Sequence, residues 1–599
     1  MRPFEHFPNL TAMFFARAAE RGDRPFLRAK QGGVWTARSW TQVAQDVSAL
    51  AAALRAHGIA PGDRVMLVSE NRPEFCIADL AIMAAGAVTV PTYTTNTSRD
   101  HAHIVTDSGA SAVIFSTPAI AKALLPALHA SPIRLAIAVE PGQAGQQGDL
   151  TILDWTELIA AHPADVAATA AAQTAGRSDL ACIIYTSGTG GAPRGVMQHH
   201  GAILCNVEGC QDIIAADFGW AAEEHDDASF LSFLPISHSY EHSAGQFLPI
   251  GLGAQIYYAE SLEKLAANIT ETRPVLMVVV PRLFEMLRGR VTKAIRQEGK
   301  VASLLLDMAL AQARRLAERD TLPLWERPLS FLLDRTLRPK ISAKFGGRLL
   351  ALVSGGAPLN GDVGRFFQAL GLTLLQGYGQ TEAGPVISCN RPRAGIRMDS
   401  VGPPLKNVEV RIADDGEILV RGETVMHGYW RSDAETARAL ADGWLHTGDI
   451  GALDARGRLS ITDRKKDIIV NDKGDNVAPQ RVEGMLTLQP EIAQAMVVGD
   501  RRPHLVALLV PDAEFAGEWA EARGLAVAAL HDNADYHAAL RLAVDRVNAE
   551  LSVIEKVRRF ALADEPFTVD NGEMTPSLKI RRHVIRARYG ERLDGLYRS

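Results

Sequence analysis

The sequence predicts an α/β protein in which a large N-terminal domain of packed sheets and helices is followed by a small C-terminal α/β domain. Helical and strand patterns alternate through the first part of the chain, as in parallel sheets covered by helices. After Val401 the pattern changes to short strands and tight turns, and a charged run at 463–467 precedes a second mixed region. At 599 residues the chain is too long for a single core.

The alternation begins near residue 39. We expect a helix at 41–57, a strand at 64–68 and a second helix at 74–85, because apolar residues recur first at helical spacing, then as a short run, then again at helical spacing. This order favours parallel strands joined by helical crossovers.

Three later apolar runs, at 181–185, 275–280 and 349–353, predict buried strands. Each leads into Gly, Pro or Ser. In open α/β sheets, ligands bind where strands end in such loops. The ends of these three strands are therefore candidate ligand sites.

Helices and hairpins account for the next regions. Between 283 and 320 apolar residues recur at helical spacing among Arg, Lys and Glu, which predicts one or two amphipathic helices packed on the surface. Hairpins are expected at 414–420 and 454–461, within a β-rich part that spans about 401–462.

Composition excludes several classes of protein. Apolar residues make up 47% and charged residues 22%, as in ordinary globular proteins. The net charge of −6 and the lack of a long Lys or Arg run argue against nucleic-acid binding. The five cysteines form no CxxC pair, and the first residues lead into no secretory signal or membrane span, so we expect a cytoplasmic enzyme.

A glycine-rich loop follows the strand at 181–185. Its residues Thr186, Ser187, Gly188 and Thr189 offer backbone N–H groups and hydroxyls, and Arg194 adds positive charge, which suits a polyphosphate. Composition alone leaves a flexible surface turn as an equal alternative. The segment is neither a Walker A loop nor a GxGxxG motif, which argues against P-loop and dinucleotide-binding proteins.

A rival signal is His238-Ser-Tyr-Glu-His242, which matches the HxxEH pattern of one class of zinc metalloprotease. Short patterns of this kind arise by chance in long chains. The preceding Leu234-Pro-Ile fits a strand end or a loop at least as well as a zinc-binding helix.

The segment Leu375-Gln-Gly-Tyr-Gly-Gln-Thr-Glu382 is a third candidate. Tyr378 can stack on a base, while Thr381 and Glu382 offer the oxygen ligands that Mg²⁺ prefers. A tight turn with an exposed Glu explains the same residues.

Two further charged residues are candidates. Asp449, in Trp444-Leu-His-Thr-Gly-Asp449, suits a ribose diol, and Lys579 lies in a basic C-terminal stretch. Each also fits an ordinary charged surface.

Together and in this order, these segments resemble the adenylate-forming superfamily of acyl-CoA synthetases, peptide-synthetase adenylation domains and luciferases. The loop at 185–195 is similar to the family's Tyr-Thr-Ser-Gly-Thr-Thr-Gly-x-Pro-Lys-Gly, and residues 378–382 to its Tyr-Gly-x-Thr-Glu. The resemblance implies an N-terminal AMP-binding and acyl-binding domain at 1–463, a mobile C-terminal domain at 464–599 and a hinge near Lys466.

The resemblance also implies roles for individual residues. Thr186 and Glu382 would hold Mg²⁺, Lys579 would bridge the substrate carboxylate and the α-phosphate of ATP, and His238 would gate the acyl site rather than bind zinc. The implied nucleotide and thiol contacts are Thr186, Ser187, Gly188, Thr189, Arg194, Gly355, Gly356, Ala357, Gln376, Gly377, Tyr378, Gly379, Thr381, Asp449, Arg464, Lys466 and Gly474.

Two departures from the family pattern concern the phosphate loop. Gly190 replaces a Thr and Arg194 replaces a Lys, so a hydroxyl is lost and a point charge becomes a planar fork. A non-catalytic nucleotide-binding protein is therefore an alternative. Against it, Thr186, Glu382, Asp449 and Lys579 are all present.

The expected substrate is a long-chain fatty acid. Residues 231–241 hold no Asp ahead of His238 to bind a substrate amine, and 69–74, 280–285 and the helical region to Asp320 resemble the long-chain fatty acyl branch. The expected activity is that of a long-chain-fatty-acid–CoA ligase, with ATP and Mg²⁺ required and coenzyme A as acceptor, because no carrier-protein domain follows Ser599. A separate carrier protein and luciferase-like oxidation are alternatives. Loose contact with the inner face of the membrane and a homodimer also remain open.

Overall fold

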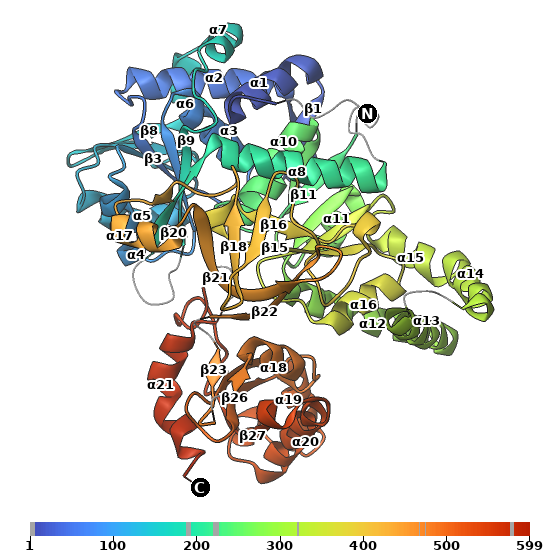
Figure 1. Ribbon diagram of the computed structural model, residues 1–599. Helices are drawn as coiled ribbons and strands as arrows, with labels where there is room; N and C mark the ends of the chain where they lie inside the picture. Colours follow the sequence, from blue (N-terminus) through green and yellow to red (C-terminus); the bar gives the residue numbers. More distant parts are fainter. Residues whose placement is uncertain are drawn as a thin grey trace.

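Two large sheets form the N-terminal domain in the computed structural model, which describes residues 6–186, 193–219, 227–319, 323–465, 468–473, 475–575 and 580–598 (Figure 1). In the first sheet, β15, β14, β13, β11, β12 and β1 run parallel, and β16 and β2 are antiparallel at its two edges. In spatial order its strands are β16 Val386–Cys389, β15 Leu374–Gly379, β14 Ala351–Ser354, β13 Leu276–Val279, β11 Ser229–Ser232, β12 Gln255–Tyr258, β1 Pro25–Gln31 and β2 Val34–Ser39.

The second sheet is also largely parallel. Its parallel centre comprises β9, β4, β3, β5, β6 and β8, while β10, β19 and β7 pair antiparallel. In spatial order its strands are β19 Gly428–Tyr429, β10 Arg194–His199, β9 Leu180–Thr186, β4 Val88–Thr92, β3 Arg64–Val68, β5 Ala112–Phe115, β6 Leu135–Ala138, β8 Leu150–Asp154 and β7 Gly145–Gln147. The central strands are continuously apolar and buried, as expected for sheets covered on both faces.

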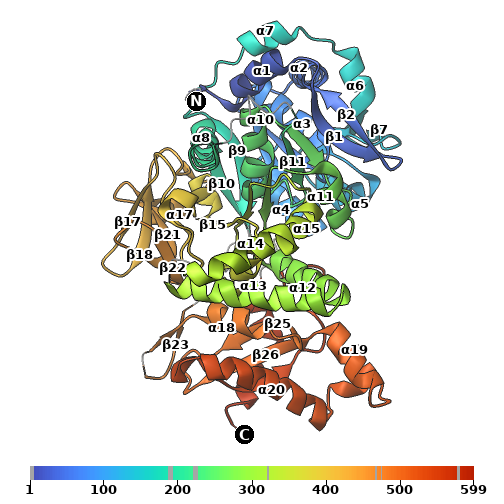
Figure 2. The same ribbon diagram turned by 90° about the vertical axis from the view of Figure 1, so that its right-hand side faces the viewer.

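Helices cover both sheets. Their bounds are α1 Leu10–Arg21, α2 Trp40–Ala56, α3 Pro73–Ala84, α4 Ser98–Ser108, α5 Pro118–His129, α6 Trp155–Ala161, α7 Val166–Ala171, α8 His200–Phe218, α9 Ser239–Glu241, α10 Leu248–Leu252, α11 Leu265–Thr272, α12 Pro281–Gln297, α13 Lys300–Arg319, α14 Arg327–Arg335, α15 Leu337–Lys344, α16 Gly361–Ala369 and α17 Asp433–Ala439. A π-helix, η2 His242–Phe247, joins α9 to α10. Helices α13 and α14 project from one side of the molecule (Figures 1 and 2).

A small antiparallel sheet follows the two large ones. It contains β17 Glu409–Ile412, β18 Glu417–Arg421, β20 Leu440–Ala441, β21 Trp444–Leu453 and β22 Leu459–Arg464. The turns between β17 and β18 and between β21 and β22 lie at the two predicted hairpins. This small sheet lies within the β-rich part expected at about 401–462.

The C-terminal part is a small α/β domain below the N-terminal domain in Figure 1. Its elements are β23 Ile469–Val470, β24 Asn476–Val477, α18 Pro479–Leu486, β25 Ile492–Val498, β26 Leu505–Pro511, α19 Ala513–Glu521, α20 Ala534–Glu550, β27 Val557–Leu562 and α21 Arg582–Gly595. Its buried apolar side chains pack with one another on both faces of the sheet β25–β26–β27. The predicted fold class, with a large and a small α/β domain, is confirmed.

The individual elements expected from the sequence are also found. Helix α2 begins directly after Ser39, whose hydroxyl accepts from the Gln42 N–H in a capping box. The strands expected at 64–68, 181–185, 275–280 and 349–353 are β3, β9, β13 and β14, and the amphipathic stretch after 283 is the helix pair α12 and α13.

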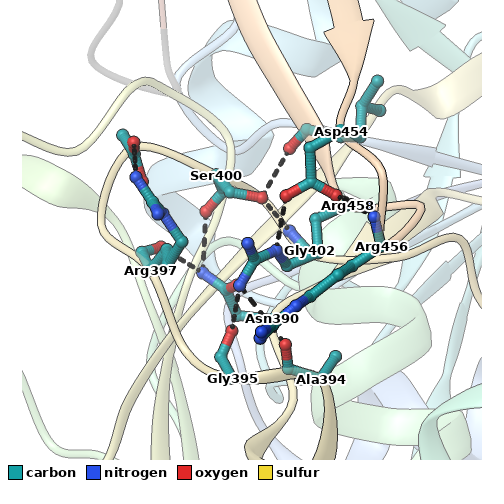
Figure 3. A network of polar contacts seen from close by, with 11 residues as sticks. Asn390, Ala394, Gly395, Arg397, Ser400, Gly402, Asp454, Arg456 and Arg458 are labelled. Carbon is teal, nitrogen blue, oxygen red and sulfur yellow. Dashed lines mark hydrogen bonds and ion pairs between the residues drawn. The ribbon is translucent and has the colours of Figure 1, made fainter. Parts of the chain in front are cut away.

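Figure 3 shows a polar network that fixes the loop after β16. The Asn390 side chain donates to the carbonyl oxygens of Arg397 at 2.9 Å and Ser400 at 2.7 Å, and the Ser400 hydroxyl donates to that of Leu459 in β22 at 2.8 Å. The Asn390 N–H also donates to the Gln376 carbonyl in β15 at 2.8 Å. The network therefore ties the β21–β22 hairpin to the end of the first large sheet.

Candidate active site

The candidate site lies where strands of both large sheets end. Strand β9 ends at Thr186, β14 is followed by Gly355, and β15 ends at Gly379. Strands β14 and β15 are parallel neighbours, so their carboxyl ends lie side by side. This is the position at which open α/β sheets bind ligands.

Tyr378, Asp449 and Arg464 form what we call the nucleoside side. The Tyr378 hydroxyl donates to Asp449 Oδ2 at 2.7 Å, and Arg464 Nε donates to Asp449 Oδ1 at 3.0 Å. Asp449 and Arg464 pair across the β21–β22 hairpin, and both Tyr378 and Asp449 are buried. Burial, assisted by the Asp449 charge, raises the pKa of Tyr378 well above its usual range, so the phenol stays protonated as a donor.

The backbone beside Tyr378 leaves little space for side chains. A Cβ on Gly379 would lie 1.8 Å from the Pro385 carbonyl oxygen, so glycine is required there. Gln376 Nε2 donates to the Met398 carbonyl at 2.8 Å, and Gly377 pairs with Cys389 across β15 and β16. These contacts hold Tyr378 in a fixed strand.

Thr186, Arg194, Glu382 and Tyr429 form what we call the phosphate side. Arg194 lies opposite Thr186 in the antiparallel pair β9–β10. Its guanidinium carbon is 4.5 Å from the centre of the Tyr429 ring, and the Tyr429 hydroxyl donates to Glu382 Oε1 at 2.9 Å. These contacts bring the predicted Glu382 to Thr186 and Arg194, which precede it by nearly 200 residues in the sequence.

Arg194 also pairs with a carboxylate on this side. Arg194 NH1 donates to Glu435 Oε2 at 3.0 Å, while its buried Nε has no hydrogen-bond partner among the described residues. Burial lowers the pKa of Arg194, but Glu435, Tyr429 and Glu382 outweigh it and raise the pKa overall. An unpaired buried N–H is costly, so a ligand acceptor at Nε would be stabilising.

The segment 238–241 contacts Thr381, the residue before Glu382, and the end of β14. His238 Nδ1 accepts from the Tyr240 N–H at 3.1 Å as the helix cap, and the Ser239 and Thr381 hydroxyls are 2.9 Å apart. The Tyr240 hydroxyl donates to the Val353 carbonyl at 3.0 Å. A Cβ on Gly355 would come within 2.8 Å of the Tyr240 ring, so this glycine permits the close contact.

The same segment argues against the zinc site. His242 Nε2 contacts Asp79 Oδ2 at 2.9 Å inside the core, whereas His238 caps α9. No group of three or more His, Cys, Asp or Glu side chains within the described ranges could hold a metal. Residues 233–238 form a loop after β11, as the alternative interpretation of Leu234-Pro-Ile predicted, but the chain is helical from Ser239 on, in α9 and then the π-helix η2.

Several predicted site residues lie outside the described part of the chain: Ser187, Gly188, Thr189, Lys466, Gly474 and Lys579, together with Gly190. Of the remaining predicted residues, Gly356 and Ala357 are exposed after β14. Met574 and Ile580, on either side of the Lys579 segment, form an antiparallel bridge.

The sequence patterns did not identify Tyr429, Glu435, Ser239 or Tyr240. Tyr429 and Glu435 contact the phosphate side from positions more than 230 residues after Arg194, and no spacing rule connects them. A weak signal was present in Gly428-Tyr429-Trp430, two aromatic residues after a glycine.

Comparison with known families accounts for nearly the whole chain. Residues 14–430 match the family model described as AMP-binding enzyme, and residues 466–599 match the model described as AMP-binding enzyme C-terminal domain.

Curated relatives match over similar lengths. The long-chain-fatty-acid–CoA ligase FadD15 of Mycobacterium tuberculosis is 33% identical over 98% of this chain and 97% of its own. Human long-chain-fatty-acid–CoA ligase 1 is 30% identical over 93% of this chain and 82% of its own.

Among solved structures, the A domain of a carboxylic acid reductase from Segniliparus rugosus superimposes with a TM-score of 0.76 at 22% identity, over 99% of this chain and 94% of that one. A benzoate CoA ligase from Burkholderia xenovorans gives 0.70 at 21% identity, over 97% and 100%. At this identity the likeness establishes the fold.

Proposed function

Since the chain belongs to the AMP-binding enzymes of the adenylate-forming superfamily, we propose that it is a long-chain-fatty-acid–CoA ligase. It is an adenylate-forming, acyl-activating enzyme that binds ATP. The proposal adds the acid, a long-chain fatty acid, and the acceptor, coenzyme A. The relatives at 30–33% identity, which carry that activity in their names, support both additions.

The observation that carries the proposal is the Tyr378–Asp449–Arg464 cluster beside Arg194 and Glu382. The Asp449 carboxylate lies between the Tyr378 ring and the Arg464 guanidinium. A carboxylate there can accept hydrogen bonds from a ribose diol while the ring stacks on the base. Beyond it, the positive charge and the unpaired Nε of Arg194 suit the phosphates of ATP.

The reaction proceeds in two steps. A carboxylate oxygen of the fatty acid attacks the α-phosphorus of ATP, and the bond to pyrophosphate breaks, which gives acyl-AMP. The thiol of coenzyme A loses its proton, and the thiolate then attacks the acyl carbon. AMP leaves with the oxygen that came from the acid.

Mg²⁺ would neutralise charge on the phosphates as pyrophosphate departs. The residues fit such an ion, because the hard oxygen ligands of Thr186 and Glu382 lie on the phosphate side and Tyr429 orients Glu382 through its hydrogen bond. Tyr378 and Asp449 would hold the nucleoside, and Gly355, Gly356 and Ala357 would lie beside the adenine. The two departures from the family pattern, Gly190 and Arg194, are compatible with ATP binding if the two terminal nitrogens of the Arg194 guanidinium bind phosphate oxygens.

Lys579 would bridge the attacking carboxylate and the α-phosphate, because a cation between two anions offsets their repulsion. A lone ammonium cannot serve both steps from one place, so the C-terminal domain, from about residue 464, would rotate about a hinge near Lys466 and bring Gly474 to the thiol. In this scheme His238 gates the acyl site.

The test is pyrophosphate release from MgATP with carboxylates from acetate to oleate, with and without coenzyme A. Release only with long chains, and acyl-CoA formed after thiol addition, would support the proposal. Release without thioester would favour a carrier protein as acceptor. No release with any acid would leave a non-catalytic nucleotide-binding protein.

A Lys579→Ala variant separates the two steps. We expect pyrophosphate release to fall by about 100-fold or more, because the bridging charge is lost. Thioester formation from added acyl-AMP should stay near the wild-type rate. Lys556→Ala, a change elsewhere in the C-terminal domain, is the matched control.

A further inference from the structure

Helix α4 contacts the strand ends that carry the phosphate side of the candidate site. Like the other helices in the described part of the chain, α4 is not long and apolar enough to span a membrane. Its polar side chains find partners within the protein instead. His103 and Asp107 lie four residues apart and therefore on one face of the helix, and both contact residues of the second large sheet.

Asp107 holds the strand that leads into the phosphate loop. The Tyr185 hydroxyl donates to Asp107 Oδ2 at 2.5 Å. Burial, together with the Asp107 carboxylate, raises the pKa of Tyr185 well above its usual range, so the phenol stays protonated as a donor. Tyr185 directly precedes Thr186 in β9. Because successive side chains of a strand point to opposite faces, fixing Tyr185 also fixes the direction of Thr186.

His103 holds the strand that follows the loop. Its Nε2 donates to the Pro193 carbonyl oxygen at 2.9 Å, and Pro193 directly precedes Arg194. The His103 ring also meets the Tyr185 ring edge-on, with 6.2 Å between the ring centres and an angle of 88° between the ring planes. One face of α4 therefore contacts both chain segments that flank residues 187–192, which lie outside the described part of the chain.

A third contact of α4 reaches the segment that carries Tyr429. The Trp430 indole N–H donates to the Asp107 carbonyl oxygen at 3.0 Å, and Trp430 directly follows Tyr429. Three of the four residues of the phosphate side, Thr186, Arg194 and Tyr429, therefore each have a chain neighbour that α4 contacts.

The C-terminal end of α4 is itself fixed. Arg64 Nε donates to the Ser108 carbonyl oxygen at 3.0 Å, and Arg64 NH2 donates to that of Gly109 at 2.7 Å. Carbonyl groups at the end of a helix have no partner within the helix, so these donors stabilise it. The helix can therefore hold the strand ends in a constant position.

We propose that His103 and Asp107 are positioning residues for ATP, which hold Thr186 and Arg194 where both can contact the phosphates. Asp107 acts through the strand before the phosphate loop, and His103 acts through the segment after it. The phosphate contacts of Thr186 and Arg194 rest on the proposed function. Loss of either positioning residue weakens the binding of MgATP and leaves the transfer of the acyl group to the thiol unchanged.

The experiment measures the dissociation constant of MgATP by isothermal titration calorimetry without acid, and KM for MgATP in pyrophosphate release. His103→Phe keeps a ring beside Tyr185 but removes the donor to Pro193. We expect it to raise both constants about fivefold, the effect of one lost hydrogen bond. His103→Gln, whose amide can replace the donor, should bring both constants back to within about twofold of the wild type.

A double-mutant cycle tests Asp107. Asp107→Ala and Tyr185→Phe should each raise the dissociation constant of MgATP about tenfold. The double variant should be little worse than either single variant, because both changes remove the same hydrogen bond. Thioester formation from added acyl-AMP and coenzyme A should stay near the wild-type rate in all three variants, because that step does not use the groups that bind pyrophosphate.

Matched controls change the same chemistry elsewhere. His57→Phe removes a ring nitrogen that lies 2.9 Å from the Ala53 carbonyl oxygen, in a ring that meets His162 edge-on. Tyr597→Phe removes a hydroxyl that donates to the Val498 carbonyl oxygen. Both controls should bind MgATP like the wild type. Circular dichroism melting shows that each variant is folded.

Two results would overturn the proposal: folded variants of His103 and Asp107 that bind MgATP as the controls do, or effects that simply add in the double variant. Equal losses in His103→Phe and His103→Gln would overturn the role of the His103 donor. A wild type that binds MgATP but activates no acid would contradict the proposed function alone, because the affinity for MgATP is measured without acid.

Discussion

The nucleoside side and the phosphate side of the site differ in how far the protein satisfies its own polar groups. On the nucleoside side both oxygens of the buried Asp449 carboxylate already accept hydrogen bonds, from Tyr378 and Arg464. On the phosphate side Arg194 pairs with Glu435 through NH1, yet its buried Nε has no partner among the described residues. The first arrangement is rigid before a ligand arrives, and the second keeps binding capacity for one.

Among changes on these two sides, Asp449→Asn should have the largest effect. The change removes the charge that Arg464 and Tyr378 share, and it weakens the expected contact with the ribose. We expect kcat/KM for ATP to fall about 100-fold, because hydrogen bonds to a charged group are lost and Arg464 is left without its carboxylate. Steady-state pyrophosphate release measures it.

The control for Asp449→Asn is Asp227→Asn, which breaks the exposed pair with Arg348 and should leave ATP kinetics unchanged. Equal effects of the two changes would contradict a special role for the nucleoside side.

Substitutions of Arg194 test the phosphate side. Arg194→Ala should raise KM for MgATP about tenfold or more with little change for the fatty acid. Arg194→Lys should raise it only about threefold, because the charge stays while the fork and the contact with the Tyr429 ring are lost. If alanine and lysine behaved alike, charge at this position would not bind phosphate.

Tyr429→Phe is a smaller test of the same side. It deletes the hydroxyl that donates to Glu382. We expect the Mg²⁺ concentration for half-maximal pyrophosphate release to rise about fivefold, since one hydrogen bond that orients the carboxylate is lost. Tyr257→Phe, on β12, is the control. An unchanged Mg²⁺ requirement would mean either that Glu382 does not bind Mg²⁺ or that the Tyr429 hydroxyl does not orient Glu382.

These tests bear on how much of the site the sequence could predict. The apolar run at 181–185 and the helical spacing of apolar residues at 41–57 are local signals, so β9 and α2 were predicted. The contact between Tyr378 and Asp449 spans 71 residues, and only the family motifs suggested it.

Other contacts in the site could not be predicted from local sequence patterns. Nothing local links Arg194 to Glu435, 241 residues away, because packing of β10 against β19 and α17 creates that contact. The π-helix after His238 was missed for a similar reason. It buries His242 against Asp79, 163 residues away, and that pairing is decided by tertiary packing.

The smallest expected effect concerns Glu241, behind the site. Burial raises the pKa of this carboxyl to about 8, although the nearby polar groups of Ser232 and Phe233 act to lower it. The native state then keeps the proton while the unfolded state loses it as pH rises from about 4.5 to 8. The wild type loses stability across that window, and Glu241→Gln removes the loss.

We therefore expect the melting temperature of Glu241→Gln to match the wild type near pH 4.5 and to exceed it by about 1–3 °C at pH 8. Differential scanning fluorimetry across this range measures the difference, with the exposed Glu518→Gln as control. A difference that does not change with pH would mean that Glu241 is ionised in the folded protein.

The central claim, activation of a fatty acid through acyl-AMP, is tested most directly with a carboxyl-¹⁸O-labelled long-chain acid. The wild type would be incubated with MgATP and coenzyme A, and the nucleotide products analysed by mass spectrometry. The account predicts AMP that carries one ¹⁸O atom from the acid, together with pyrophosphate and acyl-CoA. Unlabelled AMP, or ADP and phosphate in its place, would contradict it.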